Sequence, residues 1–314
     1  MKPAVEADGL NPLAPIYAMA VAAPLFWAGN FVVARLLLHD EIPPFQMSFW
    51  RWVIALVVLV LWTRHSLGVA GLSGAARAGY RQILRKDWLW LAFLGAIGVT
   101  AFNCLVYVGL GRTTVVNGAL INALMPALTF LFAAVFIGER FTLRRLAGLA
   151  LCLTGALIIA ARGDPGSLGR VWMGGGDLLI LAAVSCWALY TVLVRWRPSA
   201  LPVPVFLVVT TAFGVAFHLP LIAWEVARAG TFAASPGNLA ALVYLGIFPS
   251  VLAYIFWNRA IATIGPGRTG MFMYLMPLFS AVLAVVILGE RVHAFHLAGA
   301  ALIFSGIVIV TRRA

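Results

Sequence analysis

The chain has 314 residues, of which 63% are hydrophobic and 10% are charged, with a mean hydropathy of +1.01. A soluble domain carries about 25% charged residues to cover its surface, so this composition excludes a water-soluble globular protein and indicates an exterior that faces lipid. The net charge of +12 does not indicate a nucleic-acid partner, because the Arg residues stand singly between apolar runs rather than on one face. Basic loops beside an anionic membrane leaflet have this pattern.

Apolar runs follow one another along almost the whole chain. A membrane span needs about 20 mainly apolar residues, and cuts at charged or Pro/Gly-rich breaks predict ten spans. They lie near residues 15–38, 43–63, 88–110, 114–137, 143–161, 174–195, 202–224, 238–258, 268–288 and 292–311. The longer connections are 64–87, with five basic residues, and 162–173, which contains the turn sequence GDPGSLG. The first run exceeds the apolar core of a signal peptide and is expected to be retained as a span.

The basic residues are distributed unequally between the two ends of these spans. With the N-terminus inside, fifteen of the 22 basic residues fall on the cytoplasmic side and six on the outer side. Because cytoplasmic loops carry the excess of Lys and Arg, both termini are predicted to be cytoplasmic.

Sequence motifs of the first half of the chain recur in the second half. At an offset of 151, residues 125–160 and 276–311 match at 14 of 36 positions, including Met-Pro and Gly-Glu-Arg. FWAGNFVVAR, from Phe26, similarly parallels CWALYTVLVR, from Cys186. Each half, 1–163 and 164–314, therefore holds five spans, and the odd number places the second half in the membrane upside down. Such inverted repeats are typical of secondary transporters, whose substrates bind near the midplane at the repeat interface.

These motifs resemble those of the drug/metabolite transporter superfamily, and most closely its ten-span EamA-type permeases of bacteria. The resemblance covers about residues 15–311. It implies an all-α basket of ten transmembrane helices with a central cavity, in the bacterial inner membrane. It also implies export of metabolites, and the chain is similar to exporters of aromatic and amphipathic amino acids.

No cofactor or metal is expected. Cys104, Cys152 and Cys186 lie in apolar segments without the spacing of a metal site. The ten acidic residues avoid the middles of the predicted spans, which disfavours proton coupling through a buried carboxylate and a site for permanent organic cations. The His and acidic residues form no nucleophile–base pair, so the chain is not expected to be an enzyme.

Uncharged polar residues one helical turn from an aromatic residue are the candidates for a substrate site. Such pairs share one helix face, and an apolar wall with a few hydrogen-bonding groups suits a small amphipathic ligand. The predicted lining of a midplane cavity is Trp27, Asn30, Asn103, Tyr107, Asn122, Trp187, Tyr190, Tyr254, Trp257 and Tyr274. Interfacial aromatic belts and interhelical Asn contacts are the competing interpretation.

Several other residues have two interpretations. Pro126 and Pro277 occupy equivalent repeat positions and are predicted hinges. Arg51 is either a substrate-carboxylate anchor or an interfacial residue whose charge reaches the membrane surface, and its place at a span start favours the second. Glu139 and Glu290 either form a gate ion pair or belong to a helix-end turn, which the Gly-Glu-Arg sequence favours. The small-residue runs 148–155 and 299–306 favour helix packing within a monomer and leave a homodimer open.

The sequence therefore predicts a secondary transporter that exports small amphipathic metabolites, with amino acids bearing aromatic or similar side chains as the expected substrates. Its partners are a small-molecule substrate and membrane lipid, with no nucleic acid. The alternatives are an exporter of other compounds such as organic cations, a non-transporting membrane scaffold or a membrane enzyme.

Overall fold

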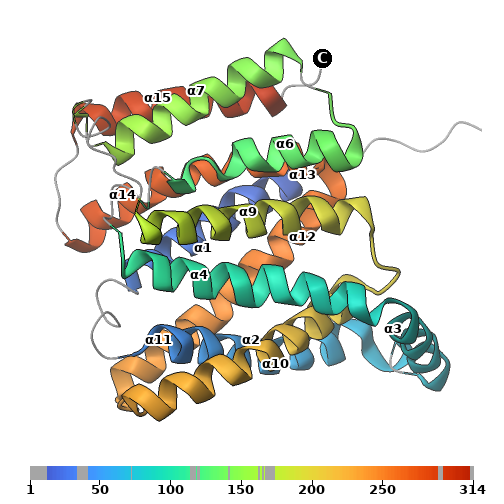
Figure 1. The fold of residues 1–314 in the computed structure, drawn as a ribbon. Helices are drawn as coiled ribbons and strands as arrows, with labels where there is room; N and C mark the ends of the chain where they lie inside the picture. The colour runs from blue at the N-terminus through green and yellow to red at the C-terminus, as the bar shows by residue number, and fades with distance from the viewer. Residues whose placement is uncertain are drawn as a thin grey trace, which may run out of the picture.

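The computed structural model describes residues 13–33, 42–71, 73–113, 118, 121–140, 142–161, 163–164, 166, 174–288 and 293–311. The predicted all-α class is confirmed, since these residues form helices and turns with no strand. Seven helical stretches in this part of the chain are long and apolar enough to cross a membrane, and Met125–Ile137 is a shorter apolar helix. The helices lie side by side, with α7 and α15 along one edge and α2, α10 and α11 along the opposite edge (Figure 1).

The first half contributes α1 (Ala14–Val33), α2 (Pro44–Gly71), α3 (Gly74–Gly95), the π-helical segment η2 (Ala96–Ala101), α4 (Phe102–Leu110), α6 (Met125–Ile137) and α7 (Leu143–Ala160). The second half contributes α9 (Gly175–Trp196), α10 (Val203–Ala229), α11 (Pro236–Ile247), the π-helical segment η3 (Phe248–Leu252), α12 (Ala253–Ile264), α13 (Pro266–Met271), the 3₁₀ turn η4 (Phe272–Tyr274), α14 (Leu275–Leu288) and α15 (Ala294–Thr311).

The stretch 64–87, expected as a connection, is largely helical. Helix α2 continues to Gly71, with a break at Gly68 where φ is +56°, and α3 begins at Gly74. The Ser73 hydroxyl accepts a hydrogen bond from the Ala76 amide at 3.3 Å and caps α3. The basic residues of this stretch are therefore carried on helices.

Helices of the two halves pack against each other throughout. Helix α2 packs on α10, α7 on α15, α1 on α12 and α14, and α9 on α4 and α6. Helices α3 and α11, which precede the two π-helical segments, pack on α10 and α2 respectively. The core of the molecule is consequently an interface between the halves.

The π-helical segments interrupt the helices Gly74–Leu110 and Pro236–Ile264. In each, an amide bonds to the carbonyl five residues earlier, Phe102 to Ile97 and Ala253 to Phe248. A π-helical turn inserts an extra residue and leaves a carbonyl free for another donor, and such turns often mark functional sites.

Candidate functional site

Five aromatic rings meet where α1, α9 and α12 cross. The Trp27 ring contacts Trp187 and Trp257, at centroid distances of 5.1 and 5.2 Å. Trp187 also packs against Tyr190 at 5.4 Å and Tyr254 at 5.1 Å. We call Trp27, Trp187, Tyr190, Tyr254 and Trp257 the aromatic cluster; all five are buried. Edge-to-face contacts dominate the cluster, the geometry favoured by the ring quadrupoles.

Helical spacing explains how α12 builds its part of this cluster. Tyr254, Trp257, Asn258 and Ile261 follow one another at intervals of three, one and three residues and are all buried. These intervals place them on one face of the helix, which is turned toward α1 and α9. The opposite arrangement, with these rings in an interfacial belt, would leave them exposed.

Most of the indole N–H and phenol O–H groups in the aromatic cluster have hydrogen-bond partners. The Trp27 Nε1 donates to the Pro249 carbonyl at 2.9 Å, and the Tyr254 hydroxyl donates to the Gly98 carbonyl at 2.6 Å, so both use carbonyls of π-helical segments. The Tyr190 hydroxyl exchanges hydrogen bonds with the Asn258 amide at 3.1–3.2 Å.

The Trp187 Nε1 is the exception among the hydrogen-bonding groups of the aromatic cluster. Within the part of the chain that the structure describes, it is buried without a hydrogen-bond partner. A buried N–H without a partner costs about 1–3 kcal/mol, so each such group calls for an explanation.

A buried polar group adjoins the aromatic cluster. The Arg51 side chain, from α2, is 2% exposed. Its Nη1 donates to Asn30 Oδ1 at 3.1 Å and to the Tyr107 hydroxyl at 2.6 Å, and its Nε donates to Ser250 Oγ at 2.9 Å. We call Arg51, Asn30, Tyr107 and Ser250 the Arg51 cluster.

The Arg51 cluster and the aromatic cluster are continuous. The Arg51 guanidinium lies 5.5 Å from the Trp52 ring centroid, and Trp52 contacts the Tyr254 ring at 4.9 Å. Asn30 stands three residues after Trp27 on α1, so the two side chains share a helix face. A positive charge with neutral hydrogen-bonding groups thus lies beside an aromatic wall.

The interpretation of Arg51 as an interfacial residue is wrong, because its charge is inside the protein. Its place near the start of α2 suggests the membrane surface, but α1, α4 and η3 cover it. Glu225, on α10, lies outside both clusters: its carboxylate accepts the backbone amides of Phe45 and Gln46, at 3.2 and 2.8 Å. Glu225 is thus the cap of α2 and stabilises its N-terminus.

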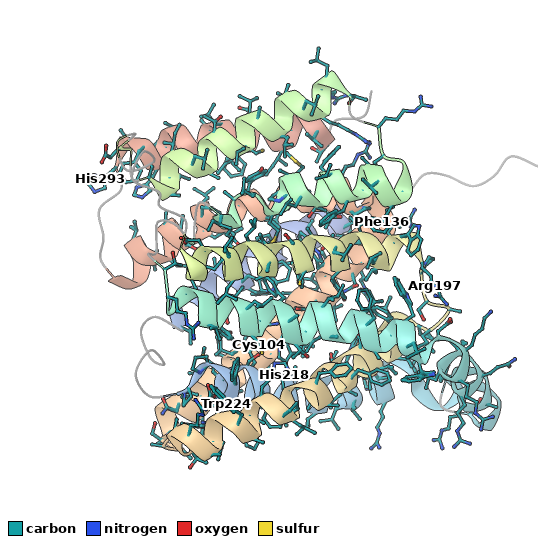
Figure 2. The ribbon with its side chains drawn as sticks, in the orientation of Figure 1. Cys104, Phe136, Arg197, His218, Trp224 and His293 are labelled. Atoms are coloured by element: carbon teal, nitrogen blue, oxygen red, sulfur yellow. The ribbon has the colours of Figure 1, made fainter. Side chains whose placement is uncertain are left out.

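A second buried polar contact joins α2 to α10. The His218 ring, fully buried, lies 2.8 Å from Ser48 Oγ through Nε2 and 2.8 Å from the Gly214 carbonyl through Nδ1. Since the carbonyl is an acceptor, Nδ1 carries the proton and Nε2 accepts from the Ser48 hydroxyl. Cys104 lies beside Ser48, and Figure 2 shows Cys104 and His218 between α4 and α10.

A cavity of about 570 Å³ opens between these two helices. Its lining is almost entirely apolar: Phe45, Ala96, Thr100, Ala101, Cys104, Leu105, Val108, Leu179, Phe217 and Leu221. None of the ten residues predicted to line a midplane cavity belongs to it. In this structure five of the seven predicted aromatic residues, those of the aromatic cluster, instead pack against one another.

The structure brings most of the predicted residues together. Trp27, Trp187, Tyr190, Tyr254 and Trp257 form the aromatic cluster, while Asn30 and Tyr107 belong to the Arg51 cluster. Asn103 donates to the Val99 carbonyl of its own helix at 2.8 Å. Its side chain lies next to that of Tyr254.

Two predicted residues lie elsewhere. Tyr274 is buried in a separate apolar cluster with residues of α7 and α15. The Asn122 side chain is half-buried and lies 3.9 Å from the Met276 sulfur. Their predicted substrate role therefore has no support from contacts with the other eight residues.

The two predicted hinges follow breaks in the helices. Pro126 stands in the first turn of α6, after a turn at residues 123–124, and Pro277 is the third residue of α14, after η4. In a first turn the missing amide costs no helical hydrogen bond. Both prolines thus begin helices rather than break them, and their hinge role stays a prediction.

Ion pairs and aromatic rings lie at the end of the molecule that holds the C-terminal ends of α6 and α9. Arg197 pairs with Asp87 at 2.6 Å, and its backbone carbonyl accepts the Trp90 indole N–H at 3.2 Å. Figure 2 shows Arg197 and Phe136 at this end, with Trp224 and His293 at the other.

The contacts of Glu139 agree in part with a gate ion pair and in part with a helix-end turn. Gly138, with φ of +71°, ends α6 as the helix-end turn requires. However, Thr142 rather than Glu139 caps α7, and Glu139 pairs with Arg145 at 3.3 Å while lying against Gly267 of α13. Glu290 lies outside the described residues.

The geometry defines a helical membrane protein in which a buried cluster of polar groups and aromatic rings lies between the two halves, and no group of three metal-ligating side chains occurs among the described residues. The chain belongs to the EamA-like transporter family, whose model matches residues 14–161 and 174–312. It is thus a transporter of multi-pass membrane type.

Individual relatives agree with this assignment. The uncharacterized transporter YyaM of Bacillus subtilis is 28% identical over 294 residues, covering 93% of this chain and 92% of that protein. A probable terminal-alkyne amino-acid exporter of Streptantibioticus cattleyicolor is 31% identical over 291 residues, covering 91% and 90%. A crystal structure with 21% sequence identity has a TM-score of 0.76, covering 95% of this chain and 96% of the other, which supports the fold.

Proposed function

We propose that this transporter exports small amphipathic metabolites, above all amino acids with aromatic or similar apolar side chains, through a central site by alternating access. The observation that carries the proposal is the aromatic cluster with the Arg51 cluster beside it, built by α1, α2, α4, α9, η3 and α12. Aromatic walls bind apolar side chains, while a few directed polar groups orient the ligand. The similarity to a probable terminal-alkyne amino-acid exporter also supports an amino-acid substrate.

The proposed architecture is ten spans in two inverted five-helix repeats, residues 1–163 and 164–314. Pairing α1 with α9, α2 with α10, α4 with α12, α6 with α14 and α7 with α15 makes the largest interhelical contacts symmetric. The contact of α1 with α12 then corresponds to that of α9 with α4, while α2–α10 and α7–α15 correspond to themselves. The π-helical segments η2 and η3 also fall at equivalent positions, as a pseudo-two-fold axis requires.

Substrate entry to the aromatic cluster requires the two halves to move apart. The rings fill the space between α1, α9 and α12 in this structure, so a ligand needs a conformation in which they separate. Pro126 and Pro277, each in the first turn of a helix that follows a break, are the proposed hinges.

Transport measurement is the direct test of this function. In proteoliposomes preloaded with single radiolabelled compounds, phenylalanine, tryptophan and the terminal-alkyne amino acid propargylglycine should leave faster than from protein-free vesicles. A pH gradient applied in parallel tests the driving force. Efflux of a permanent organic cation such as tetraethylammonium that is faster than from protein-free vesicles, without protein-dependent efflux of any amino acid, would favour the alternative substrate class.

The orientation is testable by accessibility. The proposal places both termini in the cytoplasm of a bacterium, with the protein in the inner membrane. A single cysteine at Gly74, at the start of the basic helix α3, should react with an impermeant maleimide only after the cells are opened. A cysteine at Arg228, near the end of α10, should react in intact cells. The reverse result would overturn the orientation. A further outer position, Pro165, lies outside the described residues.

A further inference from the structure

We propose that the Arg51 cluster binds the carboxylate of the substrate, so that the transporter selects compounds with a carboxylate next to an apolar side chain. This inference rests on the proposed function and deepens it. It names the polar group by which the substrate is recognised.

The first argument is charge. The Arg guanidinium stays protonated in proteins, and the transfer of such an ion out of water is costly unless an opposite charge compensates it. The acceptors of Arg51, on Asn30, Tyr107 and Ser250, are all neutral. Among the described residues no carboxylate pairs with Arg51, and Glu225 is already bound to the start of α2.

The second argument is the geometry of the donors. A guanidinium presents five N–H groups in a planar fork that fits both oxygens of a carboxylate. Arg51 directs Nε and Nη1 to protein acceptors, whereas Nη2 donates to no residue in the described ranges. The Tyr107 hydroxyl and the Asn30 amide lie beside the same guanidinium and offer further donors once the substrate enters.

The third argument is position. The Arg51 guanidinium is linked through the Trp52 ring to Tyr254 of the aromatic cluster. In an α-amino acid the carboxylate carbon is bonded directly to the carbon that bears the side chain. A ligand anchored at Arg51 would therefore bring an aromatic side chain to the rings of that cluster, which explains why a charge and an aromatic wall occur together.

Competition binding separates this role from a structural one. Tritiated phenylalanine is bound to purified full-length protein in detergent without added lipid, so that no lipid carboxylate or phosphate is supplied. The competitors share one ring and differ in charge: phenylalanine, 3-phenylpropionate, phenylalaninamide and phenethylamine. Phenylalanine and 3-phenylpropionate should compete, whereas the two compounds that lack a carboxylate should be at least about tenfold weaker.

Substitution of Arg51 tests the residue itself. Arg51→Gln should weaken phenylalanine binding by about ten- to a hundredfold and bring phenylalanine and phenylalaninamide to similar affinities. Arg51→Lys keeps the charge without the fork and should retain part of the preference for the carboxylate. Arg228→Gln, which removes an exposed Arg on α10, is the matched control and should leave both affinities unchanged. A loss of folding alone would lower all affinities together without changing their ratio.

The outcomes distinguish the two proposals. If 3-phenylpropionate binds through Arg51 but no amino acid binds or crosses the membrane, the amino-acid function fails and the carboxylate site stands. If phenylalanine is transported and Arg51→Gln binds it as tightly as the wild type does, the carboxylate site fails and the function stands. Equal binding of phenylalanine and phenethylamine by the wild type would also overturn the carboxylate site.

Discussion

Replacement of Gly306 by leucine is expected to prevent stable folding. Helices α7 and α15 approach so closely that a Cβ on Gly306 would lie 2.5 Å from the Gly148 carbonyl oxygen, and would also clash with the Cys152 sulfur. The same close approach recurs further along the two helices, where a Cβ on Gly155 would lie 2.6 Å from the Gly299 carbonyl oxygen. Because backbone atoms cannot move aside as a flexible side chain can, the helices must separate.

Overpacking of a tight core typically costs about 1–3 kcal/mol and sometimes more, and here the leucine also disrupts the packing along the whole pair. The expected result is a large drop in the thermal denaturation midpoint in detergent, or loss of the monodisperse peak in size-exclusion chromatography. Gly79→Leu on α3 is the control, since no described atom beyond its chain neighbours and the backbone of its own helix lies within 4 Å of its Cβ position. An unchanged midpoint for Gly306→Leu would show that the two glycine faces do not pack within one chain, which would reopen their use in a homodimer.

The Trp187→Ala variant is expected to change which side chains the transporter accepts. The ring contacts Trp27, Tyr190 and Tyr254, so its removal opens space in the middle of the aromatic cluster. A buried Trp→Ala change costs about 3–5 kcal/mol of stability. Efflux assays should show a shift of preference from phenylalanine toward bulkier side chains.

Trp187→Phe isolates the indole N–H from the bulk of the ring. Its Nε1 has no partner in the described structure, whereas the Trp257 Nε1 donates to Thr191 Oγ1 at 3.2 Å. Trp257→Phe should therefore lose about 0.5–1.5 kcal/mol more stability than Trp187→Phe. If the substrate accepts the free N–H, Trp187→Phe weakens its apparent affinity by about two- to tenfold. Unchanged affinity and unchanged selectivity in both Trp187 variants would remove this residue from the site.

The positions of the helices are predictable because apolar runs of this length have few other structures open to them. The helical structure of residues 64–87 is not predicted in this way, because hydropathy identifies segments buried in lipid and says little about a charged helix. Here helix propensity is the better signal: residues 74–87 contain three Ala and three Arg residues, together with Gln82, Leu84 and Lys86, and all of these are good helix formers.

The aromatic cluster is predictable in part, and for a physical reason. Helical spacing places Trp27 beside Asn30 and Tyr254 beside Asn258, but it does not reveal which helices face one another. Tyr274 shows the consequence, because it also stands in an apolar run yet lies in a different apolar cluster.

Arg51 illustrates more strongly that a sequence does not reveal which helices face one another. Its partners Asn30, Tyr107 and Ser250 stand 21, 56 and 199 residues away in the sequence. Position within a span favours an interfacial residue, and only packing shows that the charge is enclosed.

The basic first half of α3 has a consequence for the choice of lipid. Arg77, Arg81, Arg85 and Lys86 are exposed on this helix, which precedes the apolar part of its span. Each cation near an anionic leaflet gains about 1 kcal/mol, an attraction that extends over only about one Debye length. Vesicles of phosphatidylcholine alone lack that surface charge, whereas phosphatidylglycerol supplies it. Reconstitution in mixed anionic lipid at low salt should therefore insert the protein with a more uniform orientation, and rising salt should randomise it.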